Sequence, residues 1–207
     1  MGTVLVGKPT DPQIDQSTLN GMFRLRDEVF NKRLGWNLKS QNGHEYDHYD
    51  ALHPVYMVVS DKSHLVAGCW RLLPTTGPYM LKDTFPQLLR GQAAPVSPDI
   101  WEISRFVMVP TSQQDLRQVN LSALTFEMLR RAVSFADQQG IRRYVFVTSV
   151  ALERLLRKIG LPLHRFGDGE AQLVGQVRSA ACWIDVTEGR EAALGEPSTT
   201  PAYGEAA

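Results

Sequence analysis

Charged residues interrupt two stretches of this sequence that otherwise have the composition of buried β-strands. The first stretch, residues 68–81, carries Arg71, and the second, residues 101–106, carries Glu102 and Arg105. An unpaired charge in a protein interior is destabilising by several kcal/mol. These side chains therefore need partners or a ligand, and we expect both strands to border a functional site.

The composition fits one globular domain with a sizeable core. The chain has 207 residues, of which 43% are hydrophobic, and we expect a single domain over residues 1–186. Residues 187–207 are rich in Glu, Ala, Gly, Pro and Thr without an apolar period, which predicts a disordered C-terminal tail. No window reaches the roughly eighteen apolar residues of a membrane helix, so we expect a soluble, cytoplasmic protein that does not enter a membrane.

The charge distribution excludes some classes of protein. The formal net charge is zero, which argues against a nucleic-acid-binding protein. Residues 141–167 nevertheless contain six basic residues and one acid, whereas residues 42–61 contain four acids and neither Lys nor Arg. His44 and His48 lie four residues apart, but no third ligand stands at a fixed spacing, so we expect no metal site.

Hydrophobic periodicity predicts alternating strands and helices. We expect helices over residues 17–33, 116–139 and 151–159, with Ser17 as the N-cap of the first. We expect strands over residues 3–6, 55–60, 65–73, 101–109, 144–149, 163–166 and 172–186. This order predicts an α/β protein, a three-layer α-β-α sandwich resembling the N-acyltransferase (GNAT-like) fold, with a mixed central sheet and splayed strands. The Gln/Arg-x-x-Gly-x-Gly/Ala loop that holds a CoA pyrophosphate in that fold has no convincing match.

Four motifs resemble one family within this fold, the acyl-homoserine lactone synthases, which make quorum-sensing autoinducers. The motifs are Leu25–Trp36, Glu45–Asp50, Gly68–Leu81 and Trp101–Phe106. The resemblance implies that an acyl chain moves from acyl-carrier protein to the amine of S-adenosylmethionine. The methionyl carboxylate then closes a lactone and expels methylthioadenosine. No cofactor is implied, because S-adenosylmethionine is a substrate and phosphopantetheine arrives on the carrier protein.

The resemblance also implies site residues, by their positions in the motifs. Those expected to bind S-adenosylmethionine are Arg26, Phe30, Trp36, Asp47, Asp50 and Arg71. Those expected to take part in catalysis are Glu102, Arg71, Ser104 and Arg105.

Glu102 is the first candidate for the base that deprotonates the acceptor amine. An α-amino group has an unperturbed pKa near 8, so a weak base is sufficient. A structural ion pair with Arg105 or Arg71 is the alternative role. Residues three apart on a regular strand face opposite sides, so Glu102 and Arg105 share a face only if a β-bulge intervenes. A bulge would also present backbone N–H groups to the thioester oxygen, with Ser104 as the side chain best placed to assist.

The remaining polar and aromatic candidates suit a sulfonium ligand. Arg71 can bind the methionyl carboxylate with a planar fork or can organise Asp47 and Asp50, and we favour the organising role. The two carboxylates could hold a sulfonium and an ammonium group, although a solvated acidic loop is the simpler alternative. Phe30 and Trp36 could enclose the sulfonium or adenine, or could form an ordinary apolar pair.

An apolar tunnel should hold the acyl chain. In the family, a Thr on the strand at residues 144–149 is associated with 3-oxo chains. Phe146 occupies that place here, which weakens a 3-oxo prediction and leaves the chain length open. The expected lining residues, each of which could also be ordinary core, are Met80, Phe85, Phe106, Met108, Leu124, Met128, Phe146, Thr148, Ser149 and Leu155.

A basic segment is the expected surface for the acidic acyl-carrier protein, because complementary charge raises encounter rates. It contains Arg142, Arg143, Arg154, Arg157 and Lys158. A solvated helix face is the alternative. A CoA-dependent or general N-acyltransferase, and a ligand-binding module of the same fold without turnover, also stay open. The sequence does not predict the oligomeric state.

Overall fold

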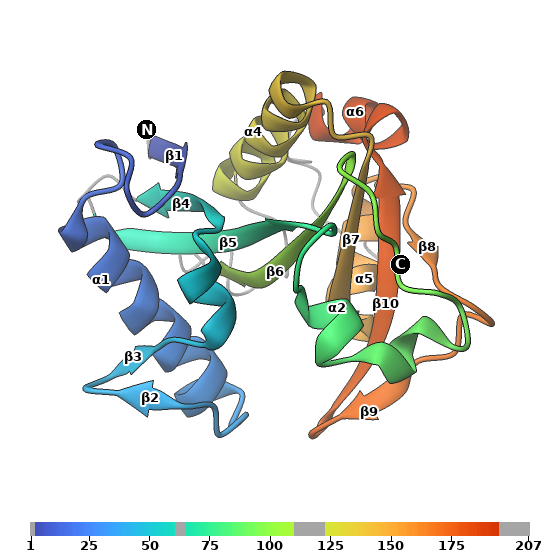
Figure 1. The fold of residues 1–207 in the computed structure, drawn as a ribbon, viewed down its shortest axis with the longest axis horizontal. Helices are drawn as coiled ribbons and strands as arrows, with labels where there is room; N and C mark the ends of the chain where they lie inside the picture. The colour runs from blue at the N-terminus through green and yellow to red at the C-terminus, as the bar shows by residue number, and fades with distance from the viewer. Residues whose placement is uncertain (1–2, 61–64, 110–122, 195–207) are drawn as a thin grey trace, which may run out of the picture.

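One large mixed β-sheet forms the centre of the protein (Figure 1). The computed structural model describes residues 3–60, 65–109 and 123–194. Within these ranges the sheet has eight strands in the order β1-β4-β5-β6-β7-β10-β8, with β9 paired to β10. Neighbouring strands are antiparallel except β6 and β7, which run parallel. The strands are β1 (Thr3–Gly7), β4 (Val55–Ser60), β5 (Val66–Pro74), β6 (Ile100–Met108), β7 (Arg143–Ser149), β8 (His164–Arg165), β9 (Gln172–Val174) and β10 (Val177–Asp185).

Helices cover both faces of the sheet. Cys69 and Trp70 are neighbours on β5, so their side chains point to opposite faces. Cys69 belongs to a hydrophobic cluster with Met22 of α1, and Trp70 belongs to a second cluster with Met128 of α4. The predicted three-layer sandwich with a mixed sheet is confirmed. The helices are α1 (Gln16–Arg26), the π-helix η1 (Asp27–Arg33), the 3₁₀-helices η2 (His48–Leu52) and η3 (Pro86–Leu89), α2 (Met80–Asp83), α4 (Ala123–Gln139), α5 (Val150–Lys158) and α6 (Val186–Leu194).

The first helix differs from the prediction at both ends. Its N-cap is Asp15, whose carboxylate accepts a hydrogen bond from the backbone N–H of Thr18 at 2.7 Å, so Ser17 lies inside the first turn. Both residue types are good N-caps, and composition did not distinguish them. At Asp27 the α-helix gives way to η1, a widened turn of the kind often found at functional sites. A short hairpin of β2 (Ser40–Gln41) and β3 (His44–Glu45) follows.

The domain boundary expected at residue 186 is wrong, because residues 186–194 form α6. Val186 and Ala193 are buried, and Arg190 pairs with Asp137 of α4 at 2.6 Å. A nine-residue helix of small and polar residues has too weak a period to stand out from a low-complexity tail. Residues 195–207, the rest of the predicted tail, and residues 116–122 of the predicted long helix lie outside the described ranges. No helix within those ranges has the length and apolar character needed to cross a membrane.

Candidate active site

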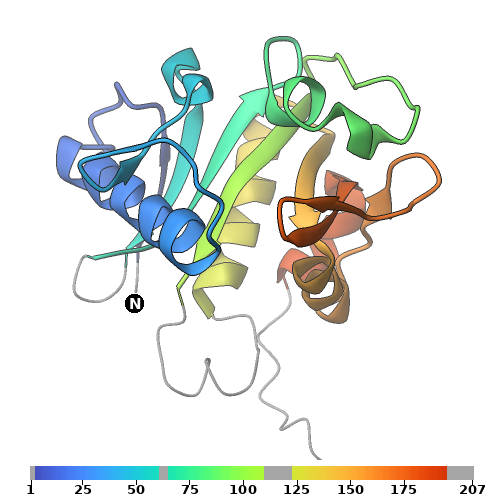
Figure 2. The same ribbon diagram turned by 90° about the horizontal axis from the view of Figure 1, so that it is seen from below.

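The parallel strands β6 and β7 separate partway along the sheet, and a cavity lies where they part. Their ladder joins Ile100–Glu102 to Arg143–Val145, and beyond it the strands diverge, as predicted (Figure 2). The cavity has a volume of about 730 Å³. Its lining includes Phe30 beside α1 and Leu129 on α4, so it extends from one face of the sheet to the other.

A β-bulge in β6 shapes the wall of this cavity. Cys69 pairs with Val107, and Arg71 pairs with Ser104, so β6 carries one extra residue between these two pairs. Arg105 lies in this interval and has a φ of 54°, in the left-handed region. The sequence left open whether a bulge separates Glu102 from Arg105, and the structure has one. It lets the side chains of the adjacent residues Ser104 and Arg105 both reach the α1 face of the sheet.

On that face, three arginines and three acids form one ion-pair network. The guanidinium of Arg26 is fully buried and donates from Nε to Glu45 at 2.5 Å and from both Nη atoms to Asp50 at 2.8 and 2.9 Å. The hydroxyl of Tyr56 also donates to Asp50, at 2.7 Å. Burial raises the pKa of Asp50, but the hydrogen bonds and charge of Arg26 and the charge of Arg71 outweigh it, and the pKa lies below its usual value.

Arg71 and Arg105 close the network around Asp47. Arg71 donates from Nη1 to Asp47 at 2.5 Å and to Asp50 at 3.0 Å. Arg105 donates from Nη2 to Glu45 at 2.8 Å and to Asp47 at 2.7 Å. Each charged side chain of this network therefore has a partner of opposite sign, as expected for buried charges such as Arg71 and Arg105.

Only some of the residues predicted to contact S-adenosylmethionine line the cavity, and the others belong to the buried part of this network. The residues expected to bind S-adenosylmethionine that line the cavity are Phe30, Trp36 and Asp47. Those that lie behind its wall are Arg26, Asp50 and Arg71. Their charged groups are directed at one another. Of the predicted catalytic residues, Glu102, Ser104 and Arg105 line the cavity.

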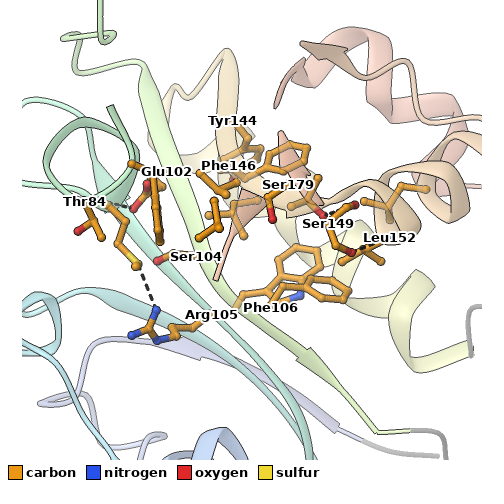
Figure 3. A pocket seen from close by; sticks show the side chains of 18 of the residues that line it. Thr84, Glu102, Ser104, Arg105, Phe106, Tyr144, Phe146, Ser149, Leu152 and Ser179 are labelled. Atoms are coloured by element: carbon orange, nitrogen blue, oxygen red, sulfur yellow. Dashed lines mark hydrogen bonds between the residues drawn. The ribbon is translucent and has the colours of Figure 1, made fainter. Parts of the chain in front are cut away.

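Backbone amides hold Glu102 at the point where the cavity passes the sheet (Figure 3). Its carboxylate accepts hydrogen bonds from the N–H groups of Met80 at 2.9 Å and Leu81 at 2.6 Å. Burial raises its pKa to about 7, although the two amides and the charges of Arg71 and Arg105 act in the opposite direction. The described ion pairs of both arginines go to other acids. A carboxyl group with this pKa can accept a proton near neutral pH.

An aromatic pair lies on the α1 side of the cavity. The rings of Phe30 and Trp36 stack with centroids 5.0 Å apart and an interplanar angle of 20°. The backbone N–H of Trp36 donates to the carbonyl of Phe30 at 2.9 Å, and the side chain of Asn31 accepts from the N–H of Leu38 at 2.6 Å. The π-helix and these bonds fix the pair, and the guanidinium of Arg105, which binds Asp47, lies 5.5 Å from the centre of the Phe30 ring. Such a pair can bind a planar or cationic group.

The opposite part of the cavity is mainly apolar. Figure 3 shows Tyr144, Phe146 and Leu152 across the cavity from Glu102. The predicted acyl-pocket residues that line it are Met80, Phe85, Phe106, Phe146, Thr148 and Ser149. Those that do not are Met108, Leu124, Met128 and Leu155, a correction to the prediction. Met128, for example, is fully buried in the core between α4 and the sheet.

The five residues of the predicted basic surface fall into two groups in the structure. Arg142 pairs with Asp99 at 2.6 Å, and Arg143 pairs with Asp185 at 2.7 Å. The other three members, Arg154, Arg157 and Lys158, are exposed on α5. Arg157 pairs with Glu153 at 3.0 Å, whereas no ion pair is found for Arg154 or Lys158 within the described part of the chain.

Several site residues were absent from the sequence prediction. Glu45 joins two arginines in the network, and its place in the acidic motif was the available signal. His48, Tyr49 and Thr84 line the cavity. Thr84 had no sequence signal, because its position follows from the short helix α2 and from its hydroxyl contact with Tyr49 at 2.7 Å.

Known proteins with similar sequences and structures identify the family. The family model described as autoinducer synthase matches residues 12–194. An acyl-homoserine-lactone synthase from Aliivibrio fischeri is 40% identical over 188 residues, which cover 90% of this chain and 95% of that protein. The crystal structure of the AHL synthase LasI is similar with a TM-score of 0.83 and 37% identity, covering 94% of this chain and 95% of LasI.

Two more distant structures complete the comparison. BjaI, a CoA-dependent acyl-homoserine lactone synthase solved with S-adenosylmethionine and isopentyl-CoA, has a TM-score of 0.77 and 25% identity, covering 90% of this chain and 84% of BjaI. An acyl-CoA N-acyltransferase from Pseudomonas aeruginosa has a TM-score of 0.57 at 12% identity, covering 89% of this chain and 99% of the acyltransferase. This similarity shows the shared GNAT-like fold alone. The chain therefore belongs to the autoinducer synthase family of acyl-homoserine-lactone synthases and is an acyltransferase.

Proposed function

We propose that this enzyme transfers an acyl chain from acyl-carrier protein to the amine of S-adenosylmethionine and then closes the lactone, releasing methylthioadenosine. One observation carries the proposal. A single cavity joins an acidic, aromatic region to a mainly apolar one, and Glu102 lies between them. Such a cavity suits a reaction that joins a cationic nucleoside substrate to an aliphatic chain.

The α1 side of the cavity suits S-adenosylmethionine. The stacked Phe30 and Trp36 rings can contact its adenine or sulfonium, and a cation over an aromatic face gains about 0.5–2 kcal/mol. Asp47 adds a carboxylate to the lining of the same cavity. The related BjaI was solved with S-adenosylmethionine, which supports the same acceptor here.

Glu102 has the role of base in the acylation step. It removes a proton from the ammonium group, directly or through one water, and the free amine attacks the thioester carbon. The new bond joins nitrogen to the acyl carbon, the carbon–sulfur bond breaks, and the thiolate leaves with a proton. Backbone N–H groups at the bulge and the hydroxyl of Ser104 are the candidate donors to the thioester oxygen.

Lactone closure needs correct folding of the bound intermediate more than a further base. A methionyl carboxylate oxygen attacks the carbon of the methionyl side chain that is attached to the sulfonium. The bond between that carbon and sulfur breaks, which releases neutral methylthioadenosine. The step is intramolecular, so a site that holds the attacking oxygen in line supplies much of the acceleration. Arg26, Arg71 and Arg105 contribute by fixing Asp47 and the surrounding wall.

The exposed cations of α5 support acyl-carrier protein as the donor. Arg154 and Lys158 are four residues apart and share a helix face without an ion pair in the described structure, so they can meet an acidic partner. The donor of BjaI is a CoA thioester, and this is the alternative that must be tested. Replacing both cations by glutamate should reduce kcat/KM for acyl-carrier protein roughly tenfold at low salt and should not change kcat/KM for acyl-CoA.

The deciding experiment supplies S-adenosylmethionine with a ladder of acyl chains, each on acyl-carrier protein and on CoA, and follows products by mass spectrometry. Lactone with equimolar methylthioadenosine supports the proposal, and the better donor identifies the carrier. The exposed residue Lys8 follows β1 at the far edge of the sheet, so Lys8→Glu is the matched charge control. Acylated amine without methylthioadenosine would instead indicate a general N-acyltransferase, and binding without any product a ligand-binding module.

A further inference from the structure

The loop after β8 contacts the end of η3 at a point where only glycine fits. Gly167 has a φ of 58°, in the left-handed region. A Cβ at this position would lie 2.3 Å from the Cβ of Arg90 and 2.8 Å from the carbonyl oxygen of the same residue. Two carbon atoms in contact normally stay about 3.5 Å apart. The absence of a side chain at Gly167 therefore lets this loop lie directly against η3.

An ion pair reinforces this contact. The guanidinium of Arg90 donates to both carboxylate oxygens of Asp168, from Nε at 2.8 Å and from Nη2 at 2.7 Å. The side chain of Asp168 is exposed, and an exposed ion pair contributes little to stability by itself. The close packing at Gly167 is therefore the stronger constraint. We call Arg90, Gly167 and Asp168 together the η3 contact.

Helices α2 and η3 form one continuous unit over residues 80–90. Two residues separate the helices, and the N–H of Phe85 between them donates to the carbonyl of Met80 at 2.9 Å. Leu81 of α2 and Leu89 of η3 are buried in the same hydrophobic cluster. Protein interiors are closely packed and transmit strain. We therefore expect a displacement of η3 to displace α2 as well.

The start of this unit holds the carboxylate of Glu102. Its described hydrogen bonds come from the backbone N–H groups of Met80 and Leu81, at 2.9 and 2.6 Å. Arg71 and Arg105, which act on the carboxylate as positive charges, belong to β5 and β6 and not to the unit of residues 80–90. The position of α2 therefore determines the hydrogen bonds of Glu102 without determining these charges.

The other titratable groups that interact with Glu102 are two tyrosines. Burial raises the pKa of Tyr49 and of Tyr79 above the usual value. Both hydroxyl groups therefore stay neutral over the pH range in which the carboxyl group of Glu102 titrates. A change in the titration of Glu102 can then be attributed to its hydrogen bonds and to its burial.

We propose that the η3 contact positions the base of the acylation step, because it sets where the α2 amides meet Glu102. This inference rests on the proposed function, in which Glu102 is the base. Neither Arg90, Gly167 nor Asp168 is among the described residues that line the cavity. They are positioning residues, which act through α2.

Gly167→Ala tests this inference, with Gly169→Ala as the matched control. Both glycines lie in the same loop with positive φ values, 58° and 75°, so alanine is strained at either position. At Gly169 the atoms nearest to an added Cβ lie 3.9 Å away, on Arg165. At Gly167 an added Cβ must push residues 89–90 away by about 1 Å. A movement of this size, transmitted to α2, would break hydrogen bonds of ordinary length.

The measurement is the pH at which the acylation rate reaches half of its plateau. Hydrogen bonds to a carboxylate lower its pKa. Loss of the amide contacts should therefore raise this midpoint by about one pH unit in Gly167→Ala, and Gly169→Ala should keep the wild-type midpoint. A smaller folded fraction lowers the rate at every pH without moving the midpoint. Equal midpoints in the two variants, or a lower midpoint in Gly167→Ala, would overturn the inference.

A second measurement follows Glu102 without turnover and separates this inference from the proposed function. Carbon-13 labelling of the glutamate carboxyl groups gives an NMR titration curve for Glu102, which is assigned by its absence in Glu102→Gln. The pKa should be higher in Gly167→Ala than in Gly169→Ala, and equal values would overturn the inference. A wild type that makes no lactone while its two variants differ in this titration would contradict the proposed function and support the positioning of Glu102.

Arg90→Gly tests the same contact from the side of η3 and does not depend on the folding of Gly167→Ala. Arg90 has a φ of 53°, a conformation that glycine adopts without strain. The change removes the Cβ that covers Gly167 and the two hydrogen bonds to Asp168. The titration midpoint of Glu102 should rise here too, and an unchanged midpoint would overturn the inference.

Discussion

Replacing Glu102 by glutamine should change how the stability of the protein depends on pH. Burial raises the pKa of Glu102 from 4.5 to about 7 in the folded protein. The folded state therefore binds this proton more tightly than the unfolded state. The resulting stabilisation is fully present below pH 4.5 and is lost as the pH rises through 7. Each pH unit between the unfolded-state and folded-state pKa values contributes about 1.36 kcal/mol, so the loss amounts to about 3 kcal/mol.

Urea unfolding of the wild type and Glu102→Gln between about pH 4.5 and 8 measures this loss. Other titrating groups are present in both proteins, so the difference between their free energies of unfolding isolates Glu102. The glutamine amide faces the N–H groups of Met80 and Leu81, which adds an offset that does not depend on pH. The wild type should lose about 3 kcal/mol relative to the variant as the pH rises. If the free energies of unfolding of the two proteins differ by the same amount at every pH, the pKa of Glu102 is not raised by folding and the reasoning is refuted.

The ionisation of Glu102 should also appear in the rate of acylation. It lowers the stability of the protein but raises the rate. The rate of amine acylation should rise as Glu102 ionises near pH 7, because only the carboxylate accepts a proton. Glu102→Gln should reduce the rate about 100- to 10,000-fold and remove this limb of the pH profile. Binding of S-adenosylmethionine, measured by calorimetry, should persist in the variant. An unchanged pH profile would exclude Glu102 as the base.

Two substitutions test the parts of the site that lie on either side of the cavity wall. Arg26→Ala removes one of the two guanidinium partners of each of two buried carboxylates, Glu45 and Asp50. It leaves the network with one uncompensated negative charge and should reduce the free energy of unfolding by about 3–5 kcal/mol in urea. A loss below about 1 kcal/mol, the range of exposed pairs, would contradict a tightly coupled network. Trp36→Ala removes a side chain that is 37% exposed, so it should raise KM for S-adenosylmethionine roughly 2- to 30-fold with little change in stability. Phe30→Ala, at a buried position, should reduce both substrate affinity and stability, and equal stability losses in the two variants would show that the pair is only structural.

The charged part of the site was predictable because buried charge follows a strict rule. Arg71, Glu102 and Arg105 interrupt hydrophobic strands, and such charges need partners. The rule predicts that partners exist but does not identify them. Backbone N–H groups of Met80 and Leu81 hold Glu102, and no side-chain pattern reports where a backbone amide will lie.

The apolar part of the site was less predictable, because core and tunnel residues have the same composition. Met128 and Leu129 are neighbours on α4, yet Leu129 lines the cavity and Met128 is fully buried in the core. The difference depends on where β6 and β7 separate and on how α4 crosses the sheet. Sequence alternation predicts which face a residue occupies, but the shape of a space between layers depends on all of them together.

The bulge at Arg105 links the two parts of the site, and its backbone can be tested separately from its side chain. A residue other than glycine in the left-handed region is destabilised by about 1–2 kcal/mol, and Arg105 has a φ of 54°. Arg105→Ala and Arg105→Gly both remove the guanidinium from Glu45 and Asp47, so their difference reports the backbone. Glycine gives up about 0.4–1 kcal/mol through the entropy of the unfolded chain, and Arg105→Gly should still be more stable than Arg105→Ala by about 1 kcal/mol. At Ile103, on the regular part of β6, the alanine variant should be more stable than the glycine variant. If alanine is the more stable residue at both positions, the conformation at Arg105 is not strained, and the bulge is maintained by side-chain ion pairs alone.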